Sequence, residues 1–180
     1  MPTVKLTSQH TRPDSIFIHD WIKPLLDENC QGLLRPIYRA IPPINNTNVR
    51  NPLSSRPSLL TTKVKCHFTK IVKFYKVENF KIFASIRDTR FQILVEFTPH
   101  CVSTFERTNR CRLTSDTTNC TLLIGDCSIE YKSSHEISQN YRLNFPNKRL
   151  LPVLTINQAS ILDRDQATLL EQFPFVYSTY

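Results

Sequence analysis

Glycine is scarce in this chain, since only Gly32 and Gly125 occur among its 180 residues. Both stand alone, so the sequence contains neither GxxxxGK[ST] nor GxGxxG, the glycine-rich patterns that cradle nucleotide phosphates. A nucleophile, a base and oxyanion donors in a recognisable set are also missing. The sequence therefore argues against an NTPase, and we expect a protein that is not an enzyme.

Long hydrophobic runs are absent as well. No segment approaches the roughly 18 apolar residues that a membrane helix requires, and the N-terminus lacks the apolar stretch of a signal peptide. We therefore expect a soluble intracellular protein with no membrane contact.

The six cysteines include no close CxxC pair of the kind that zinc and redox sites use. A reducing compartment would leave them as small buried hydrophobic residues. Cys66-His67 and His100-Cys101 would form a mixed metal site only if the fold brought them together. We expect neither a metal nor a cofactor.

Positive charge is in excess, with 23 Lys and Arg against 15 Asp and Glu, a formal net charge of +8. This balance favours a polyanion, but it serves solubility or an acidic protein partner equally well. The basic residues are scattered and form no dense run, so the sign of the charge does not choose a partner.

Alternating apolar residues dominate the middle of the chain and predict β-strands. Three such segments, 64–74, 80–86 and 91–97, are separated by polar turns and predict an antiparallel meander. Thr98-Pro99 is a good helix start, an N-cap followed by proline, and predicts a short helix to about residue 107. Further strands are expected at 122–131 and 151–156, with a polar, exposed connection between them.

Three strands, a helix and two strands follow the order of the OB-fold, a five-stranded Greek-key β-barrel. The expected fold is thus an all-β core with flanking helices, with another small β-barrel as the competing interpretation. Helices at 13–29 and 163–173 would flank the barrel at its N- and C-terminal ends. We expect residues 1–57 to form an N-terminal helix and a Pro/Asn/Ser-rich loop over 36–57, and residues 58–180 to form the OB-fold domain.

Many short motifs occur in a fixed order along the chain. They are Cys66-His67-Phe68, Lys73-Phe74-Tyr75, Ala84-Ser85-Ile86-Arg87-Asp88, Gln92-Ile93-Leu94-Val95-Glu96-Phe97, Phe105-Glu106-Arg107-Thr108, Thr117-Thr118-Asn119-Cys120, Ile124-Gly125-Asp126 and Phe173-Pro174-Phe175-Val176-Tyr177. Together they resemble one family, the small OB-fold accessory subunit of budding-yeast telomerase (the ever-shorter-telomeres family). The similarity is strong over 58–131 and 151–177, looser over 1–29, and poor over 30–57 and 132–150. The family is also similar to the OB domain of the animal shelterin protein that recruits telomerase.

The resemblance implies a nuclear telomerase subunit at chromosome ends. It would bind the N-terminal domain of the reverse transcriptase and a regulatory subunit, and would meet the telomerase RNA only indirectly. The family's telomerase-contacting surface maps onto Lys73, Glu106, Thr117, Asn119 and Asp165. Asp116 stands where the family pattern has Glu, which shortens the reach of the carboxylate.

Three further residues have roles that can be stated before the structure is known. Asp88 ends the second expected strand and Arg112 precedes the fourth, so we predict a structural ion pair between them, a role that the resemblance supports. Trp21 is the sole tryptophan and has two open interpretations, a partner-binding anchor or a residue packed on the barrel.

Single-stranded telomeric nucleic acid is the alternative ligand, because OB-folds place exposed aromatics on the face of strands 2 and 3. That face would be supplied by Tyr75, Phe83 and Phe91 together with Lys81, Arg87 and Arg90. Phe83 is the informative residue for this alternative. Its ring could stack on a base if exposed, but a second layer of core could equally cover it. The contact with DNA would be weak or assisted by the holoenzyme.

Overall fold

The computed structural model describes residues 17–30, 32, 35–44, 66–114, 117, 120–164 and 172–179. Its strands are β1 (Ile37–Ile41), β2 (His67–Glu78), β3 (Lys81–Arg87), β4 (Gln92–Phe97), β5 (Thr121–Ser133) and β6 (Leu150–Asp163). Its helices are α1 (Ile22–Asn29), α3 (Pro99–Asn109) and α4 (Ser134–Tyr141), and a 3-10 helix η3 (Val176–Thr179) ends the described chain. No helix among these residues is long and apolar enough to cross a membrane.

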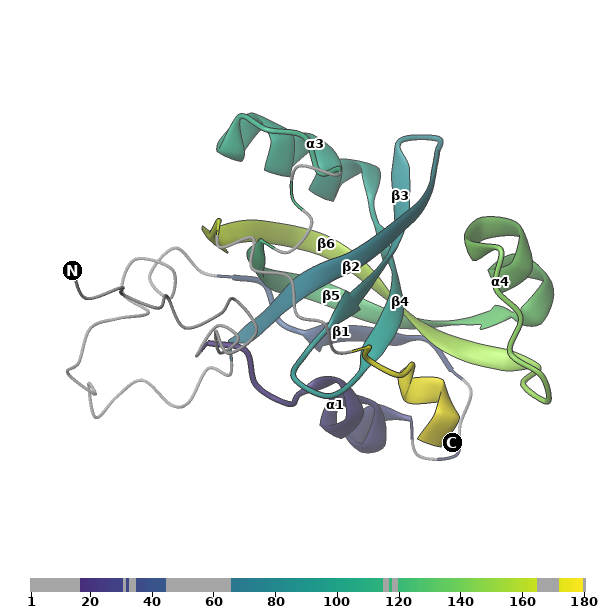
Figure 1. The fold of residues 1–180 in the computed structure, drawn as a ribbon. Helices are drawn as coiled ribbons and strands as arrows, with labels where there is room; N and C mark the ends of the chain where they lie inside the picture. The colour runs from purple at the N-terminus through teal and green to yellow at the C-terminus, as the bar shows by residue number, and fades with distance from the viewer. Residues whose placement is uncertain are drawn as a thin grey trace, which may run out of the picture.

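Five strands close into a barrel (Figure 1). β2, β3 and β4 form the predicted antiparallel meander, with Ile82 opposite Val77 on one side and Phe97 on the other. β6 pairs parallel with β4 and antiparallel with β5, and β5 returns to pair antiparallel with β2. This is the OB-fold, as the order of the sequence patterns predicted.

Alternation along the strands places the core inside the barrel. In β4, Ile93, Val95 and Phe97 have no solvent exposure, and in β3, Ala84 and Ile86 have none. The residues between them, Phe83, Ser85 and Leu94, are buried as well, so the alternation predicted the strands but not that both of their faces are covered.

The expected loop at 36–57 is wrong in its first part, because residues 37–41 form β1. This strand pairs with the outer edge of β5, where Ile37 faces Ile129 and Ile41 faces Cys127. A bulge at Arg39, whose φ is 57°, interrupts the register. The strand is held mainly by backbone pairing, and only Ile41 is fully buried, which explains its weak sequence signal.

The expected exposed connection at 132–150 is also wrong, because it contains the end of β5 and the whole of α4. β6 continues to Asp163, so this residue ends a strand and does not begin the expected helix. Most of the predicted closing helix, over 165–171, lies outside the described residues.

The N-terminal helix exists but is shorter than predicted at its start. α1 begins at Ile22, with Trp21 as its N-cap residue, and the expected capping residues Asp14 and Ser15 lie outside the described part of the chain. Pro24 occupies the first turn, where its missing N–H group needs no partner in the helix. The helix buries Ile22, Leu25 and Leu26 against the barrel.

The helix between the third and fourth strands of the barrel is confirmed with its predicted start. Thr98 caps α3, because its hydroxyl oxygen accepts a hydrogen bond from the Cys101 N–H at 3.1 Å, and Pro99 is the first helical residue. Arg110 ends the helix in the left-handed conformation. The helix packs on β6 and, with a smaller contact, on β3.

A capping box begins α4. The Ser133 hydroxyl accepts a bond from the Glu136 N–H at 3.3 Å, and the Glu136 carboxylate accepts one from the Ser133 N–H at 2.8 Å. The latter bond lowers the pKa of Glu136. The stabilisation that Glu136 provides is therefore lost as the pH falls through this lowered pKa.

Replacing Ser133 by alanine should lower the free energy of unfolding by about 1 kcal/mol, the usual cost of an N-cap. Urea denaturation of the full chain measures this change. Ser134→Ala, at the exposed first residue of the same helix, is the matched control and should change little. Equal losses in the two variants would contradict a capping role for Ser133.

Candidate protein-binding surfaces

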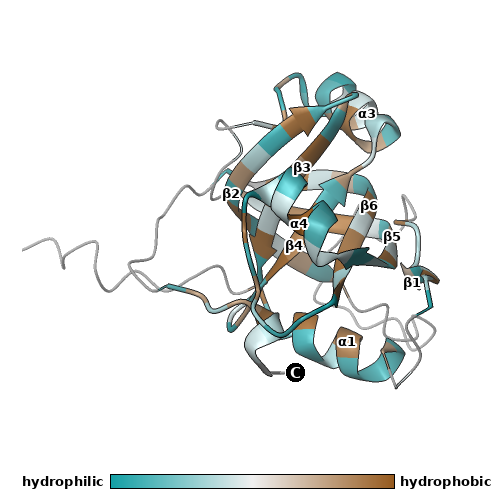
Figure 2. Ribbon diagram, turned by 90° about the vertical axis from the view of Figure 1, so that its right-hand side faces the viewer, coloured by the Kyte–Doolittle hydropathy of each residue, from teal (hydrophilic) through white to brown (hydrophobic). Residues whose placement is uncertain are grey.

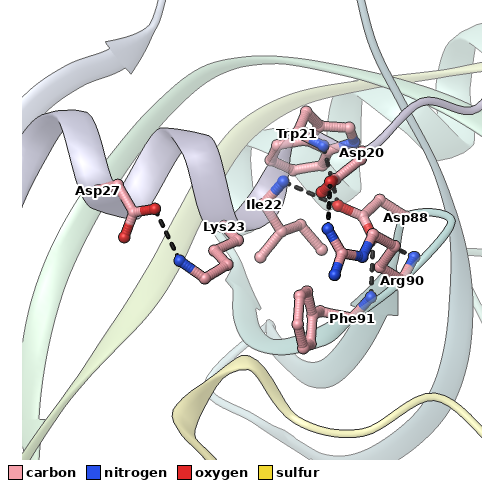
Figure 3. A network of polar contacts seen from close by, with 8 residues as sticks. All are labelled: Asp20, Trp21, Ile22, Lys23, Asp27, Asp88, Arg90 and Phe91. Carbon is pink, nitrogen blue, oxygen red and sulfur yellow. Dashed lines mark hydrogen bonds and ion pairs between the residues drawn. The ribbon is translucent and has the colours of Figure 1, made fainter. Parts of the chain in front are cut away.

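Asp88 is the most heavily bonded carboxylate in the described chain, and its side chain has no solvent exposure. Its Oδ2 accepts bonds from the N–H groups of Trp21 at 2.9 Å and Ile22 at 2.8 Å. Its Oδ1 accepts bonds from Arg90 N–H at 2.7 Å and Phe91 N–H at 2.8 Å (Figure 3). One carboxylate therefore caps α1 and also closes the turn between β3 and β4.

The predicted ion pair between Asp88 and Arg112 is not formed in the described structure. Arg112 is exposed, and the carboxylate of Asp88 has its two oxygens occupied by the four backbone donors. These donors supply the electrostatic compensation that we had expected from a cation. Arg90, in the same turn, pairs with Asp20 at 3.3 Å instead.

Trp21 is packed on the barrel and is only 8% exposed. Its indole N–H donates to the Phe68 carbonyl at 2.9 Å, and its ring meets His67 edge to face with centroids 5.1 Å apart. Trp21 also lines a hollow between α1 and β2, together with Pro24. Of its two open interpretations, the structure favours packing.

The five residues of the expected telomerase-contacting surface differ in their exposure, and two of them lie outside the described residues. Lys73 is exposed on β2, with its ammonium 5.1 Å from the ring centroid of Tyr75, and Glu106 is half-exposed on α3. Thr117 is 1% exposed, and its hydroxyl donates to the Thr114 carbonyl at 2.8 Å. Its side chain holds the loop before β5 and is not available to a partner. Asn119 and Asp165 lie outside the described residues.

Glu106 lies on α3, and Lys73 lies near the middle of β2, which runs from the α1 side of the barrel to the hairpin tip. α3 and the β2–β3 hairpin lie together at the top of Figures 1 and 2, whereas α1 and the C-terminal turn lie at the bottom. No ion pair joins the Lys73 and Glu106 side chains among the described contacts.

The tip of the β2–β3 hairpin is apolar, which was not predicted. Phe80 is 82% exposed and Val77 is 66% exposed, although both are large hydrophobic residues. Asn79 and Phe80 have φ angles of 50° and 63°, the left-handed pair of a type I′ turn. Asn is a usual residue of such a turn, and this was the available signal, but a bulky residue is strained there.

The face of β3 that would stack nucleic-acid bases is covered by α4. Phe83 is 4% exposed and packs edge to face against Tyr141, with centroids 5.6 Å apart. Tyr75 packs on the same ring at 5.5 Å. The Tyr141 hydroxyl donates to the Val95 carbonyl at 2.9 Å, and burial strongly raises its pKa. A second layer of core, formed by Tyr141 of α4, therefore covers Phe83.

Two other residues of the expected nucleic-acid face are also buried. Phe91 is 8% exposed and Arg87 is 3% exposed, with the Arg87 guanidinium 4.4 Å from the ring centroid of Phe173. Lys81 and Arg90 alone of the six expected residues are exposed. The alternative site is thus not formed as an open aromatic surface.

The cysteines are all free thiols. Burial raises the pKa of Cys101 to about 12, so it stays protonated at neutral pH. Within the described ranges, no three His, Cys, Asp or Glu residues are grouped so that they could hold a metal ion. Cys66-His67 and His100-Cys101 are therefore not brought together as a site.

A closed five-stranded barrel with this strand order defines an OB-fold protein. Comparisons with known proteins show which family of OB-fold proteins it is. Residues 18–178 match the family of the shelterin complex subunit TPP1/ACD. The chain is 35% identical over 183 residues to the telomere replication protein EST3 of Candida glabrata, covering 98% of each chain. It is 32% identical over 183 residues to EST3 of Kluyveromyces lactis, covering 99% of this chain and 98% of the relative.

Among solved structures, the fold matches the Est3 telomerase subunit of the yeast Hansenula polymorpha. The TM-score is 0.60 at 20% identity, over 99% of this chain and 89% of the other. This likeness supports the fold. The chain belongs to the TPP1/ACD and EST3 family of telomere proteins.

Proposed function

We propose that this protein is a non-catalytic telomerase subunit that binds the N-terminal domain of the reverse transcriptase and a regulatory subunit. It acts in the nucleus, at telomeres, and meets the telomerase RNA only through these proteins. Its relatives are telomere replication proteins, and one is a telomerase subunit. The barrel serves as a rigid support that favours an elongation-competent arrangement.

The burial of Phe83 beneath Tyr141 is the observation that carries this proposal. It removes the aromatic platform with which many OB-folds bind single strands, and leaves polar and charged side chains exposed around α3 and the β2–β3 hairpin. Contact with a protein suits such a surface better than base stacking does.

The reverse transcriptase domain is proposed to bind the end of the barrel that carries α3 and the hairpin. Lys73 and Glu106 would contribute opposite charges, which orient a partner and exclude wrong ones more than they add affinity. Phe80, at the hairpin tip, would supply an apolar anchor. Asn119 and Asp165 stay in the proposal on the family resemblance, and Thr117 stays only as a residue that holds its loop.

Charge reversal at this end should weaken binding. In a titration of the purified reverse transcriptase N-terminal domain, Lys73→Glu and Glu106→Lys should each raise the Kd about tenfold, since each places a like charge against the partner. Phe80→Ser should weaken binding by a similar factor through loss of the anchor. Biolayer interferometry with the full-length protein measures all three.

The matched control is Arg35→Glu, the same change of charge at an exposed arginine near β1. Circular dichroism confirms that each variant is folded. If the three variants bind as tightly as the unmodified protein, the surface assignment is wrong. A single-stranded telomeric oligonucleotide, titrated in parallel at physiological salt, tests the alternative ligand.

A further inference from the structure

Two adjoining hollows lie on the surface that the start of β6 and the C-terminal segment form. The first has a volume of about 160 Å³ and is lined by Tyr131, Leu150 and Leu151 among others. The second has a volume of about 360 Å³ and is lined by Phe145 and Phe175 among others. Lys148 and Tyr177 line both, so the hollows form one continuous surface, here called the Lys148 surface.

The walls of the Lys148 surface are held in place by the barrel. The Tyr177 hydroxyl donates to the Pro152 carbonyl at 2.7 Å and accepts a bond from the Leu94 N–H at 3.3 Å. The Gln92 N–H donates to the Pro174 carbonyl at 3.0 Å, which ties the C-terminal segment to β4. A preformed surface loses little entropy when a ligand binds.

Aromatic rings in the second hollow pack on one another. The ring of Phe145 meets Phe175 and Tyr177 edge to face, with centroids 5.3 Å and 5.1 Å away. Their faces are therefore partly used within the cluster, which suits insertion of an apolar side chain more than stacking of a series of bases. Leu150, which is 39% exposed, extends the apolar rim of the first hollow.

The charge of the Lys148 surface has one sign. Lys148 is the one charged residue among the described residues that line either hollow. It is half-buried, and its ammonium makes no ion pair with a described residue. Arg142 and Arg149, both exposed, lie in the same segment between α4 and β6. An ammonium between two apolar hollows is complementary to a carboxylate flanked by bulky apolar side chains.

We propose that the Lys148 surface binds an acidic linear segment of a partner protein. Two bulky apolar side chains of the segment fill the hollows, and a carboxylate between them pairs with Lys148. This site goes beyond the proposed reverse transcriptase contact and does not depend on it. The C-terminal turn and α3 lie at opposite ends of the molecule (Figures 1 and 2), so the two surfaces can be occupied together.

A random library of displayed twelve-residue peptides, selected on the full-length protein, tests the proposal directly. The enriched sequences should share a net negative charge and two bulky apolar residues. A fluorescein-labelled enriched peptide should bind at least tenfold more weakly to Lys148→Glu, and less weakly to Lys148→Met, which keeps the stem of the side chain without its charge. Arg35→Glu is the matched control and should bind normally.

Three results would overturn the proposal. They are a selection without enrichment, enriched peptides without acidic residues, and equal Kd values for the Lys148→Glu and unmodified proteins. Circular dichroism excludes loss of fold as a cause. Lys148→Glu should leave binding of the reverse transcriptase domain unchanged, so failure of one surface is distinguishable from failure of the other. A telomeric oligonucleotide that competes with the peptide for Lys148 would also overturn it, in favour of a nucleic-acid site.

Discussion

Asp88→Ala is expected to lower the free energy of unfolding by about 4 kcal/mol, because each buried donor left without an acceptor costs roughly 1–3 kcal/mol and relaxation recovers part of the sum. The four donors are the N–H groups at Trp21, Ile22, Arg90 and Phe91. Asp88→Asn should lose about 2 kcal/mol, since one amide oxygen still accepts while the amide nitrogen faces two donors. Urea denaturation of the full chain measures both changes.

Arg112→Ala separates this explanation from an ion pair. If the backbone donors hold Asp88, the arginine variant should change the free energy of unfolding by less than about 0.5 kcal/mol, as surface substitutions usually do. A loss as large as that of the aspartate variants, with non-additive effects in the variant that carries both Asp88→Ala and Arg112→Ala, would instead support the ion pair.

Tyr141→Ala should be nearly as damaging, with an expected loss of about 4 kcal/mol for a buried aromatic side chain. The change removes the ring that covers Phe83 and Tyr75, and it also removes the bond to the Val95 carbonyl. Tyr141→Phe, which keeps the ring, should lose about 1 kcal/mol. Thermal and urea denaturation measure the stability.

Hydrogen exchange then identifies where Tyr141→Ala acts. Amide groups of β3 and α4 should exchange faster, because the layer between them is opened. Tyr38→Ala is the matched control, since Tyr38 is 79% exposed and should tolerate the change. Unchanged protection in α4 would show that Tyr141 does not hold the helix on the sheet.

Alternation predicted the barrel because burial on one face of a strand repeats every second residue. In β4 the apolar residues Ile93, Val95 and Phe97 gave this signal, although Leu94 and Glu96 between them are also buried. β1 escaped prediction because backbone pairing to β5 holds it, and a bulge at Arg39 breaks its short pattern. Alternation within one strand does not show which other strand will pair with its edge.

α4 was missed although a signal was present. Ser133 and Glu136 have the spacing of a capping box, but the helix is mostly polar and buries only Ile137 and Tyr141. The helix covers β3 through a contact that no local pattern shows, the packing of Tyr141 on Phe83. The sequence left the role of Phe83 open for this reason.

The candidate site depended on resemblance more than on pattern. Lys73 and Glu106 are polar residues on exposed positions, and nothing local separates them from ordinary solvated side chains. Thr117 was misplaced because burial of a small polar residue in a loop depends on its hydrogen bond to the Thr114 carbonyl. Asp88 was paired with the wrong group because charge is visible in a sequence, whereas backbone donors 66 and 67 residues away are not.

The position of Trp21 gives the molecule a built-in optical reporter. It is the sole tryptophan of the chain, and its amide, its indole N–H and its ring contact Asp88, Phe68 and His67 respectively. Its fluorescence therefore reads the docking of α1 onto the barrel, while far-ultraviolet circular dichroism reads the strands. Comparing the two signals during unfolding would reveal whether the N-terminal helix and the barrel come apart in one step or in two.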